Sequence, residues 1–162
     1  YTALPLYTIS EELFQNILER NHIPAEKQQM LLQELRREKD NFLQTLQSGP
    51  VEDRIPALSR EEYAEMPLTL SLSEAFYEHE ICCTYDEYLE HSHQTMACAE
   101  HTPNYTVLSQ HTRIFRNIQI RIKHSEWVII SKNKSPVIHF VIRHPKMRKA
   151  IEDGLWQVLN EE

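Results

Sequence analysis

Histidine and cysteine side chains, which are of the right types to bind a metal ion, gather in one stretch of the chain. His91, His93, Cys98 and His101 follow one another closely within a predicted helix. Residues two positions apart on a helix point about 200° away from each other, so His91 and His93 cannot both face one ion. His91, Cys98 and His101 lie nearer to one face, but they extend over almost three turns. We therefore predict ordinary surface histidines and no metal site.

Two adjacent thiols, Cys82 and Cys83, precede the same predicted helix. The helix dipole at such a position favours the thiolate form of a cysteine, but the sequence places no base beside either residue. We therefore predict that both are small core residues. Cys98 makes the number of cysteines odd, and no C-x-x-C occurs, so the signature of a disulfide framework is missing. We expect reduced thiols and a cytoplasmic location.

Glycine is scarce, with only Gly49 and Gly154 among 162 residues. The sequence accordingly contains neither of the phosphate-binding loops G-x-G-x-x-G and G-x-x-x-x-G-K-[ST], nor the G-x-S-x-G turn of serine hydrolases. The paired carboxylates of Asp86 and Glu87 fit the first turn of a helix, where they complement its dipole. No apolar run approaches the length of about 18 residues that a membrane span needs. We predict no enzyme, no cofactor and no contact with a membrane.

Positive charge is concentrated in the second half of the chain. Residues 1–104 contain 7 basic and 19 acidic residues, whereas residues 105–150 contain 10 basic residues and a single acidic one. Some of these basic residues share one face of a predicted strand, and others surround the beginning of the last predicted helix, whose free N–H groups favour anions. The residues that we predict to bind a small anionic metabolite are Arg121, Lys123, Lys132, Arg143, His144 and Lys146.

Two other interpretations of this basic charge remain open. The basic residues can form a solvated sheet face that balances the acidic helices. Binding of nucleic acid by a sheet usually interleaves aromatic side chains with the basic ones. Phe115, Trp127 and Phe140 are available, but Phe140 lies in an almost wholly apolar strand and is predicted to belong to the core. The net charge of −7 also opposes the attraction of phosphates, so we expect no direct binding of nucleic acid.

The elements that must position these residues begin with a helical segment over residues 1–49. A capping box from Thr8 to Glu11 predicts a first helix over about 9–21, and Pro24 begins a second one over 24–48. The second helix has apolar positions close to a heptad seam, interrupted by Glu38 and Lys39. It either packs on its own domain or forms a homodimer interface. The seam residues are Leu31, Leu35, Phe42 and Leu46.

Residues 50–67 contain Pro50, Pro56 and Pro67 and no sustained period, which predicts a linker. Ser59 and Glu62 have the spacing to cap one short helical turn within it. The remainder, residues 68–162, is predicted to be an α+β domain.

Alternating Ile118, Ile120 and Ile122 predict the clearest strand of this domain. Strands over 127–131 and 137–142 follow after short connections, which predicts an antiparallel three-strand meander. Weaker strand patterns over 68–72 and 105–108 extend this to a mixed sheet of four or five strands. The predicted flanking helices are a short one over 73–77, one capped by Thr84 and Glu87, and one that begins at Pro145.

Three segments of the predicted sheet resemble the C-terminal effector regions of bacterial helix-turn-helix transcriptional regulators. They are residues 114–120 (IFRNIQI), 127–132 (WVIISK) and 138–145 (IHFVIRHP), and the resemblance covers roughly residues 68–155. It implies a ligand-sensing effector domain that acts on a DNA-binding domain missing from this chain, with the helix over 24–48 as connector or dimer element. Tyr1 is not a methionine, so we expect a preceding segment. The alternative is a protein–protein interaction domain without a small-molecule ligand.

Overall fold

The computed structural model describes residues 4–65, 81–110, 118–132 and 138–160, which form an α+β fold. Its helical elements are η1 (Leu6–Thr8), α1 (Glu11–Arg20), α2 (Ala25–Gln47), α3 (Arg60–Glu65), α5 (Tyr85–His101) and α6 (Pro145–Asn160). Its strands are β1 (Val51–Pro56), β2 (Tyr105–Gln110), β3 (Ile118–Lys123), β4 (Trp127–Lys132) and β5 (His139–Ile142). The strand and the short helix predicted over 68–77 lie outside the described residues.

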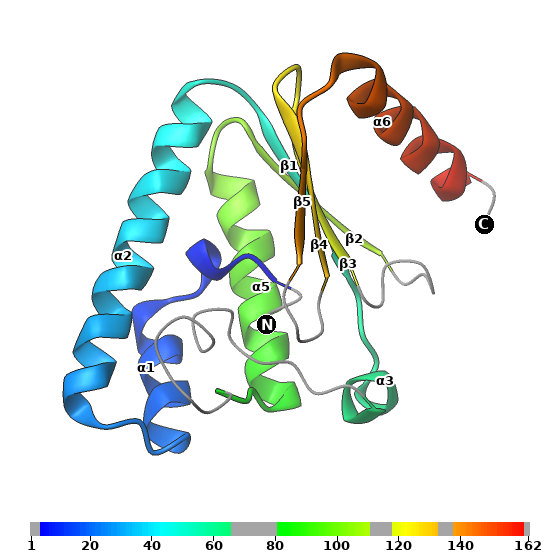
Figure 1. The fold of residues 1–162 in the computed structure, drawn as a ribbon. Coiled ribbons are helices and arrows are strands. Elements are labelled where there is room, and N and C mark those ends of the chain that lie inside the picture. Colours follow the sequence, from blue (N-terminus) through cyan, green and yellow to red (C-terminus); the bar gives the residue numbers. More distant parts are fainter. Residues whose placement is uncertain (1–3, 66–80, 111–117, 133–137, 161–162) are drawn as a thin grey trace.

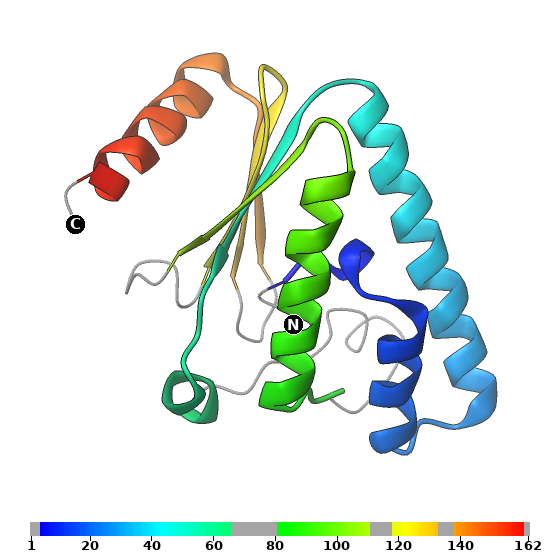
Figure 2. The same ribbon diagram turned by 180° about the vertical axis from the view of Figure 1, so that it is seen from behind.

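The five strands form one mixed sheet in the order β2-β1-β3-β4-β5. β1 and β2 are parallel, whereas β1–β3, β3–β4 and β4–β5 are antiparallel. The predicted three-strand meander is therefore confirmed. Helices α1, α2 and α5 lie on one side of the sheet and α6 lies on the other (Figure 1). The reverse view shows α5 alongside β2, the strand that follows it (Figure 2).

The predicted linker over 50–67 is wrong, because it contains β1, which pairs with strands on both sides. β1 carries charged residues at successive positions, so it shows no apolar period. Asp53 and Arg54 are nevertheless buried, and ion pairs offset the cost of burying their charges. Asp53 is 0% exposed and bound to Arg121, and Arg54 is 1% exposed and donates through Nε to Glu52 at 2.5 Å.

Helix α2 buries its seam within the chain itself. Leu31 and Leu35 pack with residues of η1 and α1 in one apolar cluster. Phe42 and Leu46 pack in a second cluster against Val51, Tyr105 and other residues of the sheet face. The interpretation in which α2 packs on its own domain accounts for these four residues, and the large apolar side chains that α2 leaves exposed are Met30 and Leu43.

A third, smaller cluster lies on the opposite face of the sheet, where Ile120, Ile122 and Val128 pack with Ile151 of α6. Phe140 of β5 does not join this core. Its side chain is 59% exposed, so the prediction that it is a core residue is wrong. The reason is that β5 is the outermost strand, and an apolar sequence alone does not distinguish an edge strand from a central one.

Two of the three helix caps that the sequence predicts are confirmed. Thr84 and Glu87 form the predicted capping box of α5, and Ser59 and Glu62 exchange the corresponding hydrogen bonds at α3. At α1, however, Ser10 caps the helix by accepting a hydrogen bond from Leu13 N, and Thr8 belongs to the preceding 3₁₀ turn. Across the ranges that the structure describes, we find no helix with the length and apolar character needed to cross a membrane.

Candidate ligand-binding site

The candidate site is built on Asp53, whose carboxylate lies between the sheet and the helices. It accepts hydrogen bonds from Arg121 Nε at 2.8 Å, from the Tyr105 hydroxyl at 2.9 Å and from the Tyr7 hydroxyl. The register places Asp53 directly opposite Arg121 on neighbouring strands, so these two side chains share one sheet face. Tyr7 arrives from η1 and Tyr105 from β2. Elements distant in sequence therefore converge on one buried charge.

The charge states of this group follow from burial and from the negative charge of Asp53. Burial and the nearby carboxylate raise the pKa of Tyr105 far above its usual value, and the same two causes, burial first, raise the pKa of Tyr7. Burial alone would lower the pKa of Arg121, but the Asp53 carboxylate beside it raises that pKa above its usual value. Both phenols therefore stay protonated hydrogen-bond donors, and Arg121 stays a cation.

Aromatic rings hold the Arg121 side chain in place. Its Cζ atom lies 4.5 Å from the centroid of the Tyr7 ring, a distance at which cation–π attraction acts. Tyr7 stacks in turn on Phe42 of α2, with ring centroids 3.7 Å apart. Although Asp53 is fully buried, the Arg121 side chain keeps 28% of its surface exposed. Arg121 thus joins a buried carboxylate to an accessible surface.

That accessible surface is a cavity of about 160 Å³ between α2 and the sheet. The sheet contributes Val51, Arg121, Trp127 and Ile129 to its wall. Helix α2 contributes Glu38, Asn41, Phe42 and Thr45, and η1 contributes Tyr7. A cavity of about 150 Å³ accommodates a benzene molecule. Apolar walls with a few polar groups are typical of small-molecule sites.

The structure brings only one of the six predicted ligand-binding residues to this cavity. Arg121 lines it, whereas Lys123 is 4% exposed, donates to Ser48 Oγ and pairs with Glu126 at 3.0 Å. Lys132 ends β4 at the opposite end from Trp127. Because the strand rises about 3.3 Å per residue, Lys132 lies roughly 16 Å from that end.

The other three predicted residues follow the end of β5. Val128 pairs with Ile142, so Arg143, His144 and Lys146 lie beyond the Trp127 end of the sheet, where α6 begins. The six basic residues therefore occupy three separate places instead of one anion site. Arg121 and Lys123 each form an ion pair, with Asp53 and Glu126, and the remaining four lie on β4, on α6 or between β5 and α6.

Sequence reasoning missed most of the cavity wall, although α2 carried a signal for it. Glu38, Asn41, Phe42 and Thr45 recur at intervals of three and four, which places them on one helix face. This face begins where the heptad seam is interrupted. An interruption of a seam by polar residues therefore marked the part of α2 that contributes to the cavity wall.

The histidines and cysteines of the described ranges do not form a second site. His91 is not a surface residue as predicted: it is 3% exposed, and its Nε2 lies 3.0 Å from both Thr8 Oγ1 and Pro5 O. Burial lowers the pKa of His91 to about 4, so it is neutral at pH 7. Cys98 and His101 contact residues of their own helix turn, Thr102 and Ala97. Among the described side chains, no group of three or more metal-ligating residues comes together.

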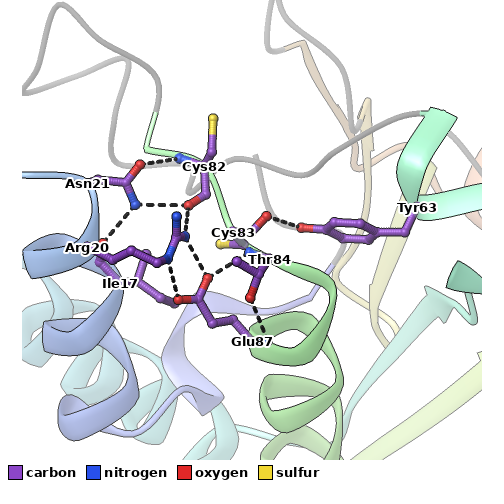
Figure 3. A network of polar contacts seen from close by, with 8 residues as sticks. All are labelled: Ile17, Arg20, Asn21, Tyr63, Cys82, Cys83, Thr84 and Glu87. Carbon is purple, nitrogen blue, oxygen red and sulfur yellow. Dashed lines mark hydrogen bonds and ion pairs between the residues drawn. The ribbon is translucent and has the colours of Figure 1, made fainter.

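Cys82 and Cys83 lie in a polar network that joins the end of α1 to the start of α5 (Figure 3). Arg20 donates from Nε and Nη2 to the two carboxylate oxygens of Glu87, both at 2.7 Å. Asn21 exchanges hydrogen bonds with the backbone of Cys82. Burial raises the pKa of Cys83 to about 12, which keeps this thiol protonated and unreactive. Cys82 is exposed and therefore not the core residue that we predicted.

We compared the chain with known proteins at three levels. No protein-family model, no curated protein and no solved structure matches it.

Proposed function

We propose that this chain is a regulatory, ligand-sensing domain that binds a small anionic metabolite in the cavity between α2 and the sheet. The observation that supports the proposal most directly is that only one of the three guanidinium nitrogens of Arg121 binds a carboxylate of the described residues. Asp53 engages its Nε atom, and within the described residues no carboxylate engages its two terminal nitrogens. A guanidinium donates through five N–H groups in a planar fork, so the terminal nitrogens can bind a carboxylate or a similar oxyanion.

The cavity wall restricts the chemistry of this metabolite further. Trp127, Phe42 and Ile129 provide an apolar surface for a flat or compact body. Glu38 and Asn41 lie on the α2 side, where a hydroxyl or amine of the ligand would meet hydrogen-bond acceptors. We therefore propose a small carboxylate of about the size of a single ring, with a donor group at its other end.

A ligand in this cavity would contact both the sheet and helix α2. Its acidic group would bind Arg121 of the sheet, and its body would contact α2. A ligand shifts an equilibrium only when it binds two states of the protein unequally. A ligand that favours one position of α2 relative to the sheet would act on whatever α2 connects to. The resemblance to effector regions supports a DNA-binding domain as the target of that signal.

The test measures thermal stabilisation of the purified chain by a panel of small carboxylates and their matched carboxamides. At a concentration of about 100 times Kd, binding adds about 2.7 kcal/mol, which raises Tm by roughly 5–10 °C in a chain of this size. We expect stabilisation by at least one carboxylate and not by its carboxamide. If no member of the panel stabilises the chain, the proposal fails.

A pair of variants then locates the binding site. Thr45→Phe fills the cavity from α2 without touching the buried ion pair, and Gln44→Phe places the same ring on the exposed side of the same helix. We expect the carboxylate to stabilise the Gln44→Phe variant and not the Thr45→Phe variant. Equal stabilisation of both variants would place the ligand elsewhere.

A further inference from the structure

The outer edge of β5 is a second surface with features of a binding site. β5 is the last strand in the sheet order and pairs with β4 on its inner side. Large apolar side chains are exposed along it and at the start of α6. The side chains and their exposed fractions are Ile138 (42%), Phe140 (59%), Val141 (53%) and Met147 (56%).

The hydrogen bonds between β4 and β5 show which backbone groups face this edge. Lys132 N donates to Ile138 O at 3.1 Å, so this pair is hydrogen-bonded across the ladder. Hydrogen-bonded and non-hydrogen-bonded pairs alternate along an antiparallel ladder. Phe140 and Ile142 therefore direct their N–H and C=O groups toward β4, whereas Val141 directs its own toward the open edge. An added strand would pair with the N–H and C=O groups of Val141.

Basic side chains lie at both ends of this edge. Lys132 lies near one end, and Arg143, His144 and Lys146 lie near the other. In the part of the chain that the structure describes, Arg121, Lys123 and Lys149 have carboxylate partners, whereas Lys132, Arg143 and Lys146 have none. The edge thus combines an apolar centre with positive charges at its two ends that no carboxylate of the described residues offsets.

We propose that the β5 edge binds an extended, acidic segment of a partner protein as a sixth strand of the sheet. The segment would carry consecutive apolar residues, which cover Phe140 on one face of the sheet and Val141 on the other, and acidic residues at its ends to meet Arg143 and Lys132. Strand addition of this kind takes its affinity from backbone hydrogen bonds and its specificity from the side chains. The proposal is independent of the α2 cavity, because β5 contributes no residue to that cavity.

A second copy of this chain fits the edge less well. Two copies of β5 related by a two-fold axis would pair antiparallel. The Arg143 end of one copy would then lie beside the Lys132 end of the other, which brings like charges together. An acidic partner replaces that repulsion by attraction.

The experiment selects random 12-residue peptides displayed on phage against the purified chain and then measures the binding of the selected peptides by fluorescence anisotropy. We expect the selected peptides to carry a short run of apolar residues between acidic ones. Their binding should weaken as the salt concentration rises. Selection of peptides without acidic residues, or of none, would overturn the proposal.

Val141→Pro tests the backbone pairing directly. Proline is tolerated on an edge strand where its nitrogen faces solvent, so this change removes the outward N–H and leaves the ladder with β4 intact. We expect it to weaken peptide binding roughly fivefold or more, the loss of one backbone hydrogen bond. Val141→Thr, which keeps the N–H and the β-branched shape, is the matched control. Unfolding curves of both variants establish that they fold, and equal binding by the two would contradict strand addition.

Charge reversal tests the second element of the proposal. Arg143→Glu is expected to weaken binding of the acidic peptide by about tenfold, whereas Lys27→Glu, an exposed residue of α2, should change it less than about twofold. Equal effects of the two variants would show that peptide binding depends only on the net charge of the protein.

Sedimentation equilibrium without peptide tests whether a second copy of this chain binds at the β5 edge instead. A dimer that Val141→Pro dissociates would assign the edge to a second copy and overturn the proposal.

Discussion

Asp53 carries its negative charge in a place that water does not reach, and the three groups that donate to it replace the lost hydration. Two of these donors are phenols, whose raised pKa values keep them protonated throughout the physiological range. The third is the Arg121 guanidinium. The carboxylate therefore holds in position the cation that we propose to bind the ligand.

Replacement of the Asp53 carboxylate by a neutral side chain of the same size should destabilise the protein. Asp53→Asn keeps the side-chain size but leaves Arg121 without its counter-charge, and breaking a buried pair in this way costs about 3 kcal/mol. We expect the free energy of unfolding in urea to fall by about that amount. Asp40→Asn, which neutralises an exposed carboxylate on α2, is expected to change it by less than about 0.5 kcal/mol. Similar values for the two variants would mean that the Asp53 charge is not needed for stability.

His91 makes the stability depend on pH in a predictable direction. Because its folded-state pKa of about 4 lies below the ordinary value of 6.5, the unfolded chain binds the proton more readily. Stability from this group is complete above pH 6.5 and is lost as the pH falls from 6.5 toward 4. Between pH 7 and pH 5 this loss is about 2 kcal/mol.

The variant His91→Gln isolates that contribution. Glutamine can still bond to Thr8 or Pro5 but does not titrate. Between pH 7 and pH 5, we expect the free energy of unfolding of the wild-type protein to fall by about 2 kcal/mol more than that of His91→Gln. His93→Gln, which changes an exposed neighbour, should retain the wild-type pH dependence. If both variants follow the wild-type curve, His91 is not the group responsible.

Helix α5 lies between the sheet and α1, and its first turn is stabilised by a capping box and by an ion pair with α1. Thr84 Oγ1 accepts from Glu87 N at 3.2 Å, and Glu87 accepts from Thr84 N at 2.7 Å while it also binds Arg20 of α1 (Figure 3). Thr84→Ala removes the acceptor for Glu87 N, and the loss of such a cap costs about 1 kcal/mol. Thr84→Ser keeps the hydroxyl and should stay close to wild type in the same urea titration. A similar loss in both variants would assign the effect to the threonine methyl group.

The elements that the sequence predicted correctly are those with a local signal. Alternation of Ile118, Ile120 and Ile122 identified β3, and the spacing of Thr84 and Glu87 identified the start of α5. β1 had no such signal, because its buried Asp53 and Arg54 read as solvent-exposed until their partners are known. β5 had a misleading one, because its apolar residues are typical of a core strand.

The candidate site was harder to predict than the fold for a related reason. Tyr7, Phe42, Asp53 and Arg121 belong to four different elements, so no local spacing connects them. The sequence singles out Arg121 by its charge and its strand face, and charge likewise singles out Lys132 and Arg143, which lie elsewhere in the fold. Only the strand register, which sets Asp53 opposite Arg121, distinguishes these basic residues from one another.

Over the whole molecule, α2 and the sheet share a core. Leu46 packs with Val51 and Tyr105, and Phe42 lies with its ring centroid 4.8 Å from that of Tyr105. A boundary at residue 49 would cut through this cluster. The helical segment 1–49 and the sheet should therefore unfold as one cooperative unit, in contrast to two domains joined by a linker.

Leu46→Ala tests this cooperativity, because it removes a buried side chain of α2 that touches the sheet. Truncation of a buried leucine costs about 2–5 kcal/mol. We expect a single unfolding transition, shifted to lower urea, when helix content is followed by circular dichroism and the sheet by fluorescence of Trp127 in a Trp156→Phe background. Leu43→Ala, on the exposed side of the same helix, should leave the midpoint nearly unchanged. If the circular dichroism transition shifts in Leu46→Ala while the Trp127 transition stays in place, the helices and the sheet are separate units. A ligand bound between them could then report its presence by moving one unit against the other. If both transitions shift together, α2 and the sheet unfold as one unit, and the ligand acts by favouring one position of α2 within that unit.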